Sequence, residues 1–259
     1  MKLAITGKGG VGKTTFAALL SQVYANMGKD VLAVDADPSP SLAGALGFPD
    51  HLLEQLKPIS EMDELIYERT GARPGSVGGF FTINPRVDDI PDEYSILFNG
   101  IRLLELGAVD SGGSGCICPE SAMLKTLFTH LLFRKDEVLI LDMYAGVEHL
   151  GRATVDFVNA MIIVVEPTRR SIAVAKQIKL LANDIGLDRL WVIGNKIRNQ
   201  DDLKFLGENS LNLPILGSLP VDYSVQEADR LGISVYSHVP ELRKATEKIA
   251  EKIANEIIS

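Results

Sequence analysis

The sequence predicts an α/β fold, a doubly wound and mostly parallel sheet flanked by helices. Short apolar runs of strand length alternate along the chain with segments that have the apolar spacing of helices, and this alternation is typical of parallel strands covered on both faces. A glycine-rich loop ending in Lys13-Thr14 separates the first such run from the first helical segment. At 259 residues the chain is long enough for one large core, so we expect a single domain over 1–259.

In the first half of the chain, each apolar run of strand length is a predicted strand. These runs cover residues 2–6, 30–35 and 100–106. The first helix follows the glycine loop and is expected to end at Gly28, a residue suited to the left-handed position after a helix. We expect a loop with a short helix over 39–49, a helix over about 50–70, and an irregular excursion over 71–95, which is rich in glycine and proline near its start.

The second half continues the alternation. A helix is expected over 119–133, because Pro119 suits the first turn of a helix. The remaining predicted strands are 137–143, 160–165, 190–194 and 215–216. The C-terminal helix carries one apolar stripe, made of Leu242, Ala245, Ile249, Ile253 and Ile257. Its polar face balances basic and acidic residues, whereas a helix on a membrane surface has a cationic excess. We therefore expect it to pack on the sheet.

Composition excludes several classes of protein. The chain is 46% hydrophobic and 23% charged, as in ordinary globular proteins, and its net charge of −8 argues against nonspecific nucleic-acid binding. The longest apolar run, 160–165, is far shorter than a membrane span of roughly 20 residues. Met1 leads directly into the first strand, so we expect no targeting segment, no stable membrane anchoring and a cytoplasmic location. The two cysteines are too few for a disulfide framework.

Residues 7–14 match G-x-x-x-x-G-K-[ST], the phosphate loop. Glycines let backbone N–H groups converge on phosphate oxygens at the positive end of a helix. Lys13 adds a charge near the β- and γ-phosphates, and the Thr14 hydroxyl ligates Mg²⁺. The dinucleotide fingerprint G-x-G-x-x-G also matches, but it does not require Lys13-Thr14 after the last glycine. The predicted nucleotide-binding residues of this loop are Gly9, Gly10, Val11, Gly12, Lys13, Thr14 and Thr15.

A second lysine narrows the class. Residues 8–15, Lys-Gly-Gly-Val-Gly-Lys-Thr-Thr, resemble the deviant phosphate loop of the MinD, ParA, arsenite-pump and nitrogenase iron-protein ATPases. In that family the extra lysine reaches across a dimer interface to the partner's nucleotide. The resemblance implies a phosphate-loop ATPase of the deviant Walker A (SIMIBI) type, with Lys8 acting in trans much as an arginine finger does.

Carboxylates follow two predicted strands, where ligands of open α/β sheets bind. Asp142, followed by Ala145-Gly146, resembles the Walker B strand and second switch, which implies a role for Asp142 in holding Mg²⁺. Asp37 resembles the first-switch aspartate that orients the attacking water, and Asp35 is expected to support Mg²⁺ or its waters. The alternative for Asp35 and Asp37 is a charged turn formed with Pro38.

The residues after the strand at 190–194 indicate which base is bound. Asn195-Lys196 is followed at 198 by an arginine, which cannot accept hydrogen bonds as the aspartate of the guanine-binding N-K-x-D motif does. Adenine needs a donor and an acceptor, and an asparagine amide supplies both, so ATP is favoured over GTP. A turn after the strand is the alternative. Residues 217–222 resemble the family segment whose backbone flanks the base. The predicted base-contacting residues are Asn195, Lys196, Pro220, Val221 and Asp222.

Cys116 and Cys118 form a C-x-C motif in a predicted metal-binding loop, 111–119. A buried, inert pair is the alternative. Three features argue against it: the glycine-rich loop before the pair, the place of Cys118 as the N-cap of the next helix, and the ease with which a thiol there becomes a thiolate ligand. A tetrahedral thiolate site needs four sulfurs, and a two-fold axis doubles two to four. The motif therefore predicts a dimer with the metal on its axis. Zn²⁺, Ni²⁺ and Cu(I) all remain open.

These features together resemble the CooC-type ATPases, the nickel-insertion accessory proteins of carbon monoxide dehydrogenase and of the related acetyl-CoA synthase. The matching segments are the phosphate loop, 35–38, 84–88, the C-x-C motif, and 142 with 145–150. The resemblance implies a homodimeric metallochaperone that uses ATP and Mg²⁺, binds Ni²⁺ or Zn²⁺ at the cysteine pair, and serves one of those nickel enzymes. A MinD- or ParA-like positioning ATPase without metal is the alternative. An iron–sulfur reductase would require a cysteine spacing that is missing here.

Overall fold

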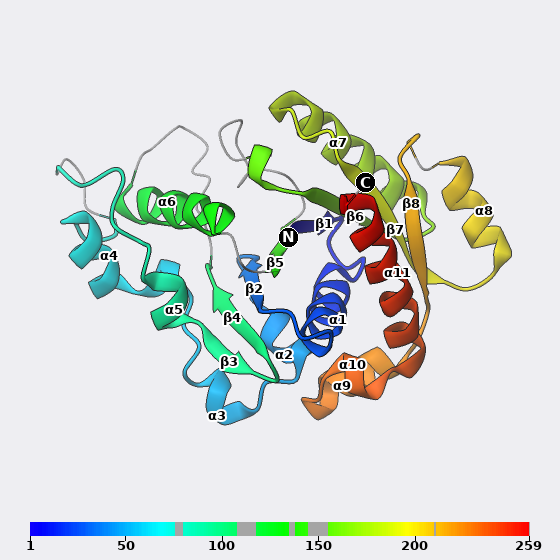
Figure 1. Cartoon of the computed structure of the whole chain (residues 1–259), viewed down its shortest axis with the longest axis horizontal. Helices are drawn as coiled ribbons and strands as arrows, with labels where there is room; N and C mark the ends of the chain where they lie inside the picture. The colour runs from blue at the N-terminus through cyan, green and yellow to red at the C-terminus, as the bar shows by residue number, and fades with distance from the viewer. Residues whose placement is uncertain (76–79, 108–117, 135–137, 145–154, 210, 259) are drawn as a thin grey trace.

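The computed structural model describes residues 1–75, 80–107, 118–134, 138–144, 155–209 and 211–258. One eight-stranded sheet runs through it in the order β3-β4-β2-β5-β1-β6-β7-β8 (Figure 1). The described strand pairs are parallel except for β3 with β4, which is antiparallel. The predicted α/β fold with a mostly parallel sheet is therefore confirmed.

The strands coincide with the aliphatic runs of the sequence. They are β1 (Lys2–Gly7), β2 (Val31–Ala36), β3 (Ile96–Phe98), β4 (Ile101–Glu105), β5 (Val138–Met143), β6 (Ala160–Val165), β7 (Leu190–Ile197) and β8 (Ile215–Pro220). In β2, β5 and β6 every residue is buried, because helices cover both faces of the sheet there.

Two apolar clusters lie between the sheet and its helices, one on each face. One face carries α1 (Lys13–Asn26), α2 (Leu42–Leu46), α9 (Ser224–Leu231), α10 (Val235–His238) and α11 (Pro240–Ile258). The other carries α4 (Asp63–Thr70), α5 (Ile90–Tyr94), α6 (Pro119–Phe133), α7 (Arg169–Ile185) and α8 (Gln200–Glu208). Figure 1 shows α6 and α7 on one side of the strands and α1 and α11 on the other.

The prediction of a single helix over about 50–70 is wrong. The segment consists of α3 (Asp50–Leu53), a 3₁₀ turn over Ile59–Glu61, and α4. Pro58 cannot donate a backbone hydrogen bond and disfavours helical backbone at the residue before it. The Ser60 N–H donates instead to the carbonyl of Leu106 at 3.0 Å, so the turn is attached to the sheet rather than continuing a helix.

The excursion expected over 71–95 contains one regular element among its described residues, α5. The Thr82 N–H donates to the carbonyl of Thr70 at 2.8 Å, which returns the chain toward α4. Strand β3 was not expected, because three residues at an edge leave no readable alternation. It extends the sheet beyond β4 by one antiparallel strand.

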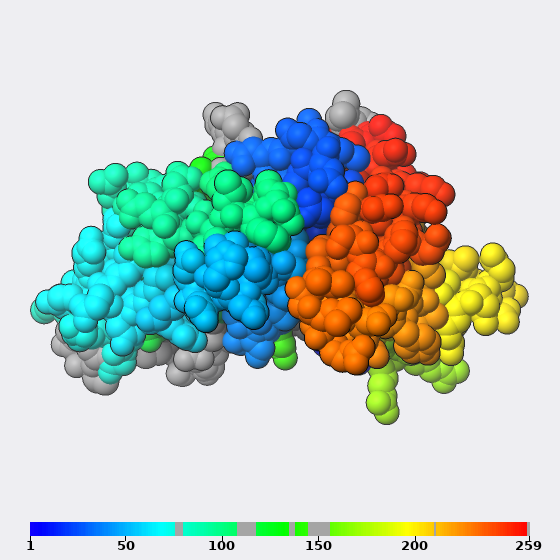
Figure 2. Space-filling model, turned by 90° about the horizontal axis from the view of Figure 1, so that it is seen from below, coloured from blue at the N-terminus to red at the C-terminus, as the bar shows by residue number. Residues whose placement is uncertain are grey.

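The C-terminal helix packs as its apolar stripe predicts. Leu242, Ile249 and Ile253 are buried, and α11 contacts α1 and β8. None of the helices in the described part of the chain combines the length and apolar content that crossing a membrane requires. Figure 2 shows a face on which the first half of the chain, including α2 and α3, lies beside the segments that carry α9 and α10.

Candidate active site

The phosphate loop connects β1 to α1 and takes left-handed backbone at two glycines, Gly10 (φ 77°) and Gly12 (φ 94°). A Cβ added at Gly12 would lie 2.3 Å from the Asn195 amide nitrogen, so only glycine fits there. Within the described residues, no side chain caps the first turn of α1. Its N–H groups and the positive end of the helix dipole are thus available to an anion.

Asn195 and Lys196, at the end of β7, hold this loop in place. The Asn195 amide nitrogen donates to the Val11 carbonyl (2.7 Å), and its oxygen accepts from the Lys196 N–H (2.8 Å). Lys196 has left-handed backbone (φ 57°), and its ammonium donates to the Gly10 carbonyl at 2.6 Å. An adenine contact would have to use the second N–H and the second lone pair of the Asn195 amide. Its base-contacting role stays a prediction.

The residues predicted to contact the base line one cavity of about 340 Å³. They are Asn195, Lys196, Pro220, Val221 and Asp222, joined there by Gly12 and Thr15 of the loop and α1. Four further lining residues were missed, namely Tyr223, Val225, Gln226 and Leu242. No motif marks these four. Three directly follow the predicted segment, but only the packing of α11 brings the fourth into the cavity.

Strand register aligns three carboxylates at the carboxyl edge of the sheet. Asp35 on β2 is in register with Asp142 on β5 and with Glu105 on β4. The Thr14 hydroxyl donates to one Asp142 oxygen at 2.6 Å, which joins the phosphate loop to the row. The other oxygen, Oδ1, is buried without a hydrogen-bond partner among the described residues. A buried carboxylate oxygen without a partner, beside a hydroxyl, fits a hard cation such as Mg²⁺.

The electrostatics of Asp142 agree with that fit. The pKa of Asp142 is raised to about 7, mainly by burial and also by the nearby charges of Asp35 and Asp37. The Thr14 hydrogen bond and the Lys13 ammonium oppose this rise in pKa only in part. The negative charges of these carboxylates are therefore only partly balanced by Lys13, and a divalent cation would balance the rest.

Asp35 is fully buried and organises the turn that follows β2. One of its oxygens accepts from the N–H groups of Ser41 (2.8 Å) and Leu42 (2.9 Å), and the other accepts from the Asp37 N–H (3.0 Å). Burial raises its pKa, and these three N–H donors oppose the rise. Asp37 is less buried and accepts from the Ser39 N–H at 2.9 Å. Asp35 therefore shapes the turn, and Asp37 is the carboxylate nearer to solvent.

Both lysines of the loop lie at the site. Lys13 is buried at the start of α1, whereas the half-buried Lys8 donates to the Gly9 carbonyl at 3.2 Å. Lys8 also lies 4.0 Å from the carboxylate of Glu166, a residue that sequence reasoning missed. Glu166 directly follows β6, so the rule that singled out the aspartates at strand ends could have identified it.

Cys118 is the N-cap residue of α6, as expected, and its thiol donates to the Ser121 hydroxyl at 2.9 Å. Cys116 and the rest of the loop up to 117 lie outside the described residues, as do 145–150 of the second-switch segment. Within the described part of one chain, no group of three or more histidine, cysteine and acidic side chains could hold a metal ion. Metal binding by the C-x-C motif stays a prediction.

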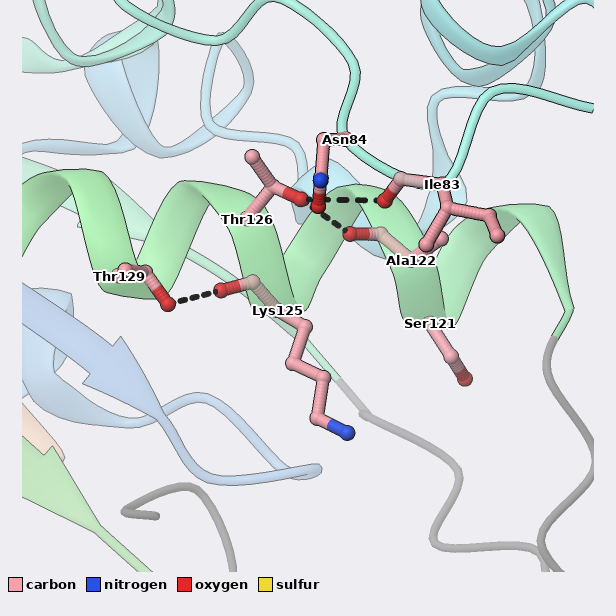
Figure 3. A pocket seen from close by; sticks show the side chains of 7 residues that line it. All are labelled: Ile83, Asn84, Ser121, Ala122, Lys125, Thr126 and Thr129. Atoms are coloured by element: carbon pink, nitrogen blue, oxygen red, sulfur yellow. Dashed lines mark hydrogen bonds between the residues drawn. The ribbon is translucent and has the colours of Figure 1, made fainter. Parts of the chain in front are cut away.

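A cavity of about 280 Å³ opens between α6 and the excursion. It is lined by Ile83, Asn84, Ser121, Ala122, Lys125, Thr126 and Thr129 (Figure 3). The Thr126 hydroxyl donates to the Ala122 carbonyl at 2.9 Å and lies 3.4 Å from that of Ile83. Ser121 accepts the hydrogen bond of the Cys118 thiol and also lines the cavity. The first turn of α6 therefore lies between the thiol and the cavity.

A glycine loop before an uncapped helix start and a buried lysine at the first turn of that helix are parts of a phosphate-loop ATPase. The chain is an enzyme of this class. It belongs to the CobQ/CobB/MinD/ParA nucleotide-binding family. Residues 2–235 match the family described as CbiA, the CobQ/CobB/MinD/ParA nucleotide binding domain.

Individual relatives agree with this assignment. The carbon monoxide dehydrogenase accessory protein CooC of Rhodospirillum rubrum is 44% identical over 243 residues, 94% of this chain and 92% of that protein. An ATP-binding protein of Methanocaldococcus jannaschii is 46% identical over 260 residues, 100% and 98% of the two chains. The MinD cell division protein of Aquifex aeolicus superposes with a TM-score of 0.68 at 20% identity, covering 98% and 96% of the chains. That last similarity shows the fold alone.

Proposed function

We propose that this chain is a dimeric, ATP-hydrolysing metallochaperone that assists nickel insertion into carbon monoxide dehydrogenase or acetyl-CoA synthase. The observation that carries the proposal is the 44% identity with the R. rubrum accessory protein over 94% of this chain. The cysteine pair adds a means of binding metal that a simple ATPase switch does not need.

In the proposed ATPase site, each predicted residue has a distinct role. Lys13 and the loop N–H groups bind the β- and γ-phosphates, and Lys8 acts on the nucleotide of the partner subunit. Asp37 orients the attacking water and accepts its proton. Thr14 and Asp142 hold Mg²⁺, with Asp35 supporting them through the turn after β2. When bound, Mg²⁺ neutralises charge on the phosphates.

The metal is bound as cargo, and the proposed ligands are Cys116 and Cys118. Cys118 lies at the positive end of α6, where an anionic ligand is favoured. Two chains related by a two-fold axis supply four thiolates, the number that a tetrahedral site needs. The metal site is then complete only in the dimer, so metal binding favours dimerisation. ATP binding favours it as well, because Lys8 reaches the nucleotide only from the partner subunit.

The test is the metal stoichiometry of anaerobically purified protein loaded with Ni²⁺ or Zn²⁺. A shared site requires about one ion per two chains, and metal alone should shift the protein toward dimer in sedimentation. Cys116→Ala and Cys118→Ala should each lose both effects while still binding ATP. Thr129→Ala is the matched control, because Thr129 lies on α6 and its hydroxyl donates only to the Lys125 carbonyl in the described structure.

One metal ion per chain with unchanged sedimentation would exclude the shared site and leave a local chelate. Absence of metal binding, with ATP-dependent dimerisation retained, would favour the alternative of a MinD- or ParA-like switch. Delivery itself is measured by adding the loaded protein to metal-free carbon monoxide dehydrogenase or acetyl-CoA synthase and following the recovery of enzyme activity. The Cys118→Ala variant should give no recovery above that obtained with free Ni²⁺.

A further inference from the structure

Glu166 lies between two lysines at the rim of the phosphate loop. One of its carboxylate oxygens is 4.0 Å from the Lys8 ammonium, and the other is 3.6 Å from the Lys196 ammonium. The Glu166 side chain is only 20% exposed, whereas the Lys8 side chain is 34% exposed. A partly buried carboxylate thus lies beside Lys8, the lysine that is proposed to act on the nucleotide of the partner subunit.

The position of Glu166 is set by its own backbone and neighbours. Its N–H donates to the Ser171 hydroxyl (3.1 Å), and its carbonyl accepts from the Thr168 N–H (2.7 Å). The Thr168 hydroxyl lies 3.4 Å from the Glu166 carboxylate. These contacts fix the Glu166 backbone at the first turn of α7, and they direct its carboxylate toward the Thr168 hydroxyl and the two lysines.

Lys196 connects the same carboxylate to the loop. Its ammonium donates to the Gly10 carbonyl at 2.6 Å while facing Glu166. Lys196 can therefore keep its contact with Glu166 whether or not Lys8 is present. Among the described residues, by contrast, the Lys8 ammonium contacts only the Gly9 carbonyl and the Glu166 carboxylate. Both contacts must break if this ammonium crosses to a partner subunit.

We propose that Glu166 is a positioning residue that retains Lys8 within its own subunit until the triphosphate of a dimer partner replaces the carboxylate. The inference rests on the proposed trans role of Lys8. Ion pairs at such distances that are only partly buried are weak, which suits an exchange that ATP must drive. A triphosphate with several negative oxygens attracts the ammonium more strongly than one carboxylate does.

The test measures the dimer dissociation constant by sedimentation with a slowly hydrolysed ATP analogue and Mg²⁺. Glu166→Gln keeps the side-chain shape and removes the competing charge, so the dimer should tighten. Each pair contributes a factor of about 1.4 to 5, and two lysines are released per dimer. We therefore expect that constant to decrease by about two- to twenty-five-fold. In a Lys8→Ala background the same change should have no effect, because the group retained by Glu166 is absent.

Glu208→Gln is the matched control. Glu208 lies on α8 and also faces a lysine, Lys204, at 4.0 Å. Its substitution removes an equal charge away from the nucleotide, so it should leave the dimer dissociation constant unchanged. An unchanged or weaker dimer in Glu166→Gln would overturn the inference, as would a shift of equal size in the Lys8→Ala background. If Lys8→Ala alone dimerises as tightly as wild type, the trans role of Lys8 is wrong, which is a separate failure.

Discussion

Glu105→Gln should stabilise the protein above neutral pH and leave its stability at low pH unchanged. Glu105 ends β4, is 9% exposed, and stands in register with Asp35 on the neighbouring strand. The pKa of Glu105 is raised from an ordinary 4.5 to about 7, mainly by burial and also by the charges of Asp35 and Glu61. The folded protein therefore resists ionisation of this group far more than the unfolded chain does.

The sign follows from proton linkage. Well below pH 4.5 the group is protonated in both states, and the folded state bears no cost. Between 4.5 and about 7 the folded protein keeps a proton that the unfolded chain has released, so the free energy of unfolding falls as pH rises. Above pH 7 the cost is complete. A rise from 4.5 to about 7 corresponds to about 3 kcal/mol. Allowing for relaxation around a replacement amide, we expect Glu105→Gln to gain about 2 kcal/mol at pH 8.

Urea unfolding of both proteins at pH 4.5 and pH 8, without nucleotide or Mg²⁺, measures this difference. Asp142 also has a raised pKa, but it is present in both proteins, so its contribution cancels in the comparison. Glu208→Gln, an exposed glutamate on α8, serves as the control and should differ little from wild type at either pH. An equal gain in the free energy of unfolding at both pH values, or a loss of stability at pH 8, would show that the folded protein does not oppose ionisation of Glu105.

Two further predictions concern the ATPase site. Gly12→Ala should weaken ATP binding, measured by calorimetry, at least about tenfold. Left-handed backbone costs a residue with a Cβ about 1–2 kcal/mol, and that Cβ would also clash with Asn195. An unchanged affinity for ATP would mean that the loop can rearrange. Asp142→Asn should raise the Mg²⁺ concentration needed for half-maximal hydrolysis, since it replaces a carboxylate ligand by a weaker amide, and identical Mg²⁺ curves for the variant and wild type would remove Asp142 from the metal site.

Local pattern was sufficient where one short segment carries all the information. The phosphate loop is contiguous, and its glycines, Lys13 and Thr14 are specified by chemistry within eight residues. Cys118 as the N-cap of α6 was predictable for the same reason, because Pro119 marks the helix start. Asp142 needed one further rule, that parallel strands end at a common edge where ligands bind.

Tertiary structure decided whatever depends on contacts between distant segments. The break near Pro58 is completed by a hydrogen bond from Ser60 to Leu106, a partner that no local window contains. The positions of Glu105 beside Asp35 and of Glu166 beside Lys8 depend on the order of strands in the sheet. A chain can be read for propensity and periodicity residue by residue, but strand order and side-chain direction emerge only when buried surfaces are packed together. The electrostatics of the site therefore belong to the fold, whereas its phosphate-binding chemistry belongs to the sequence.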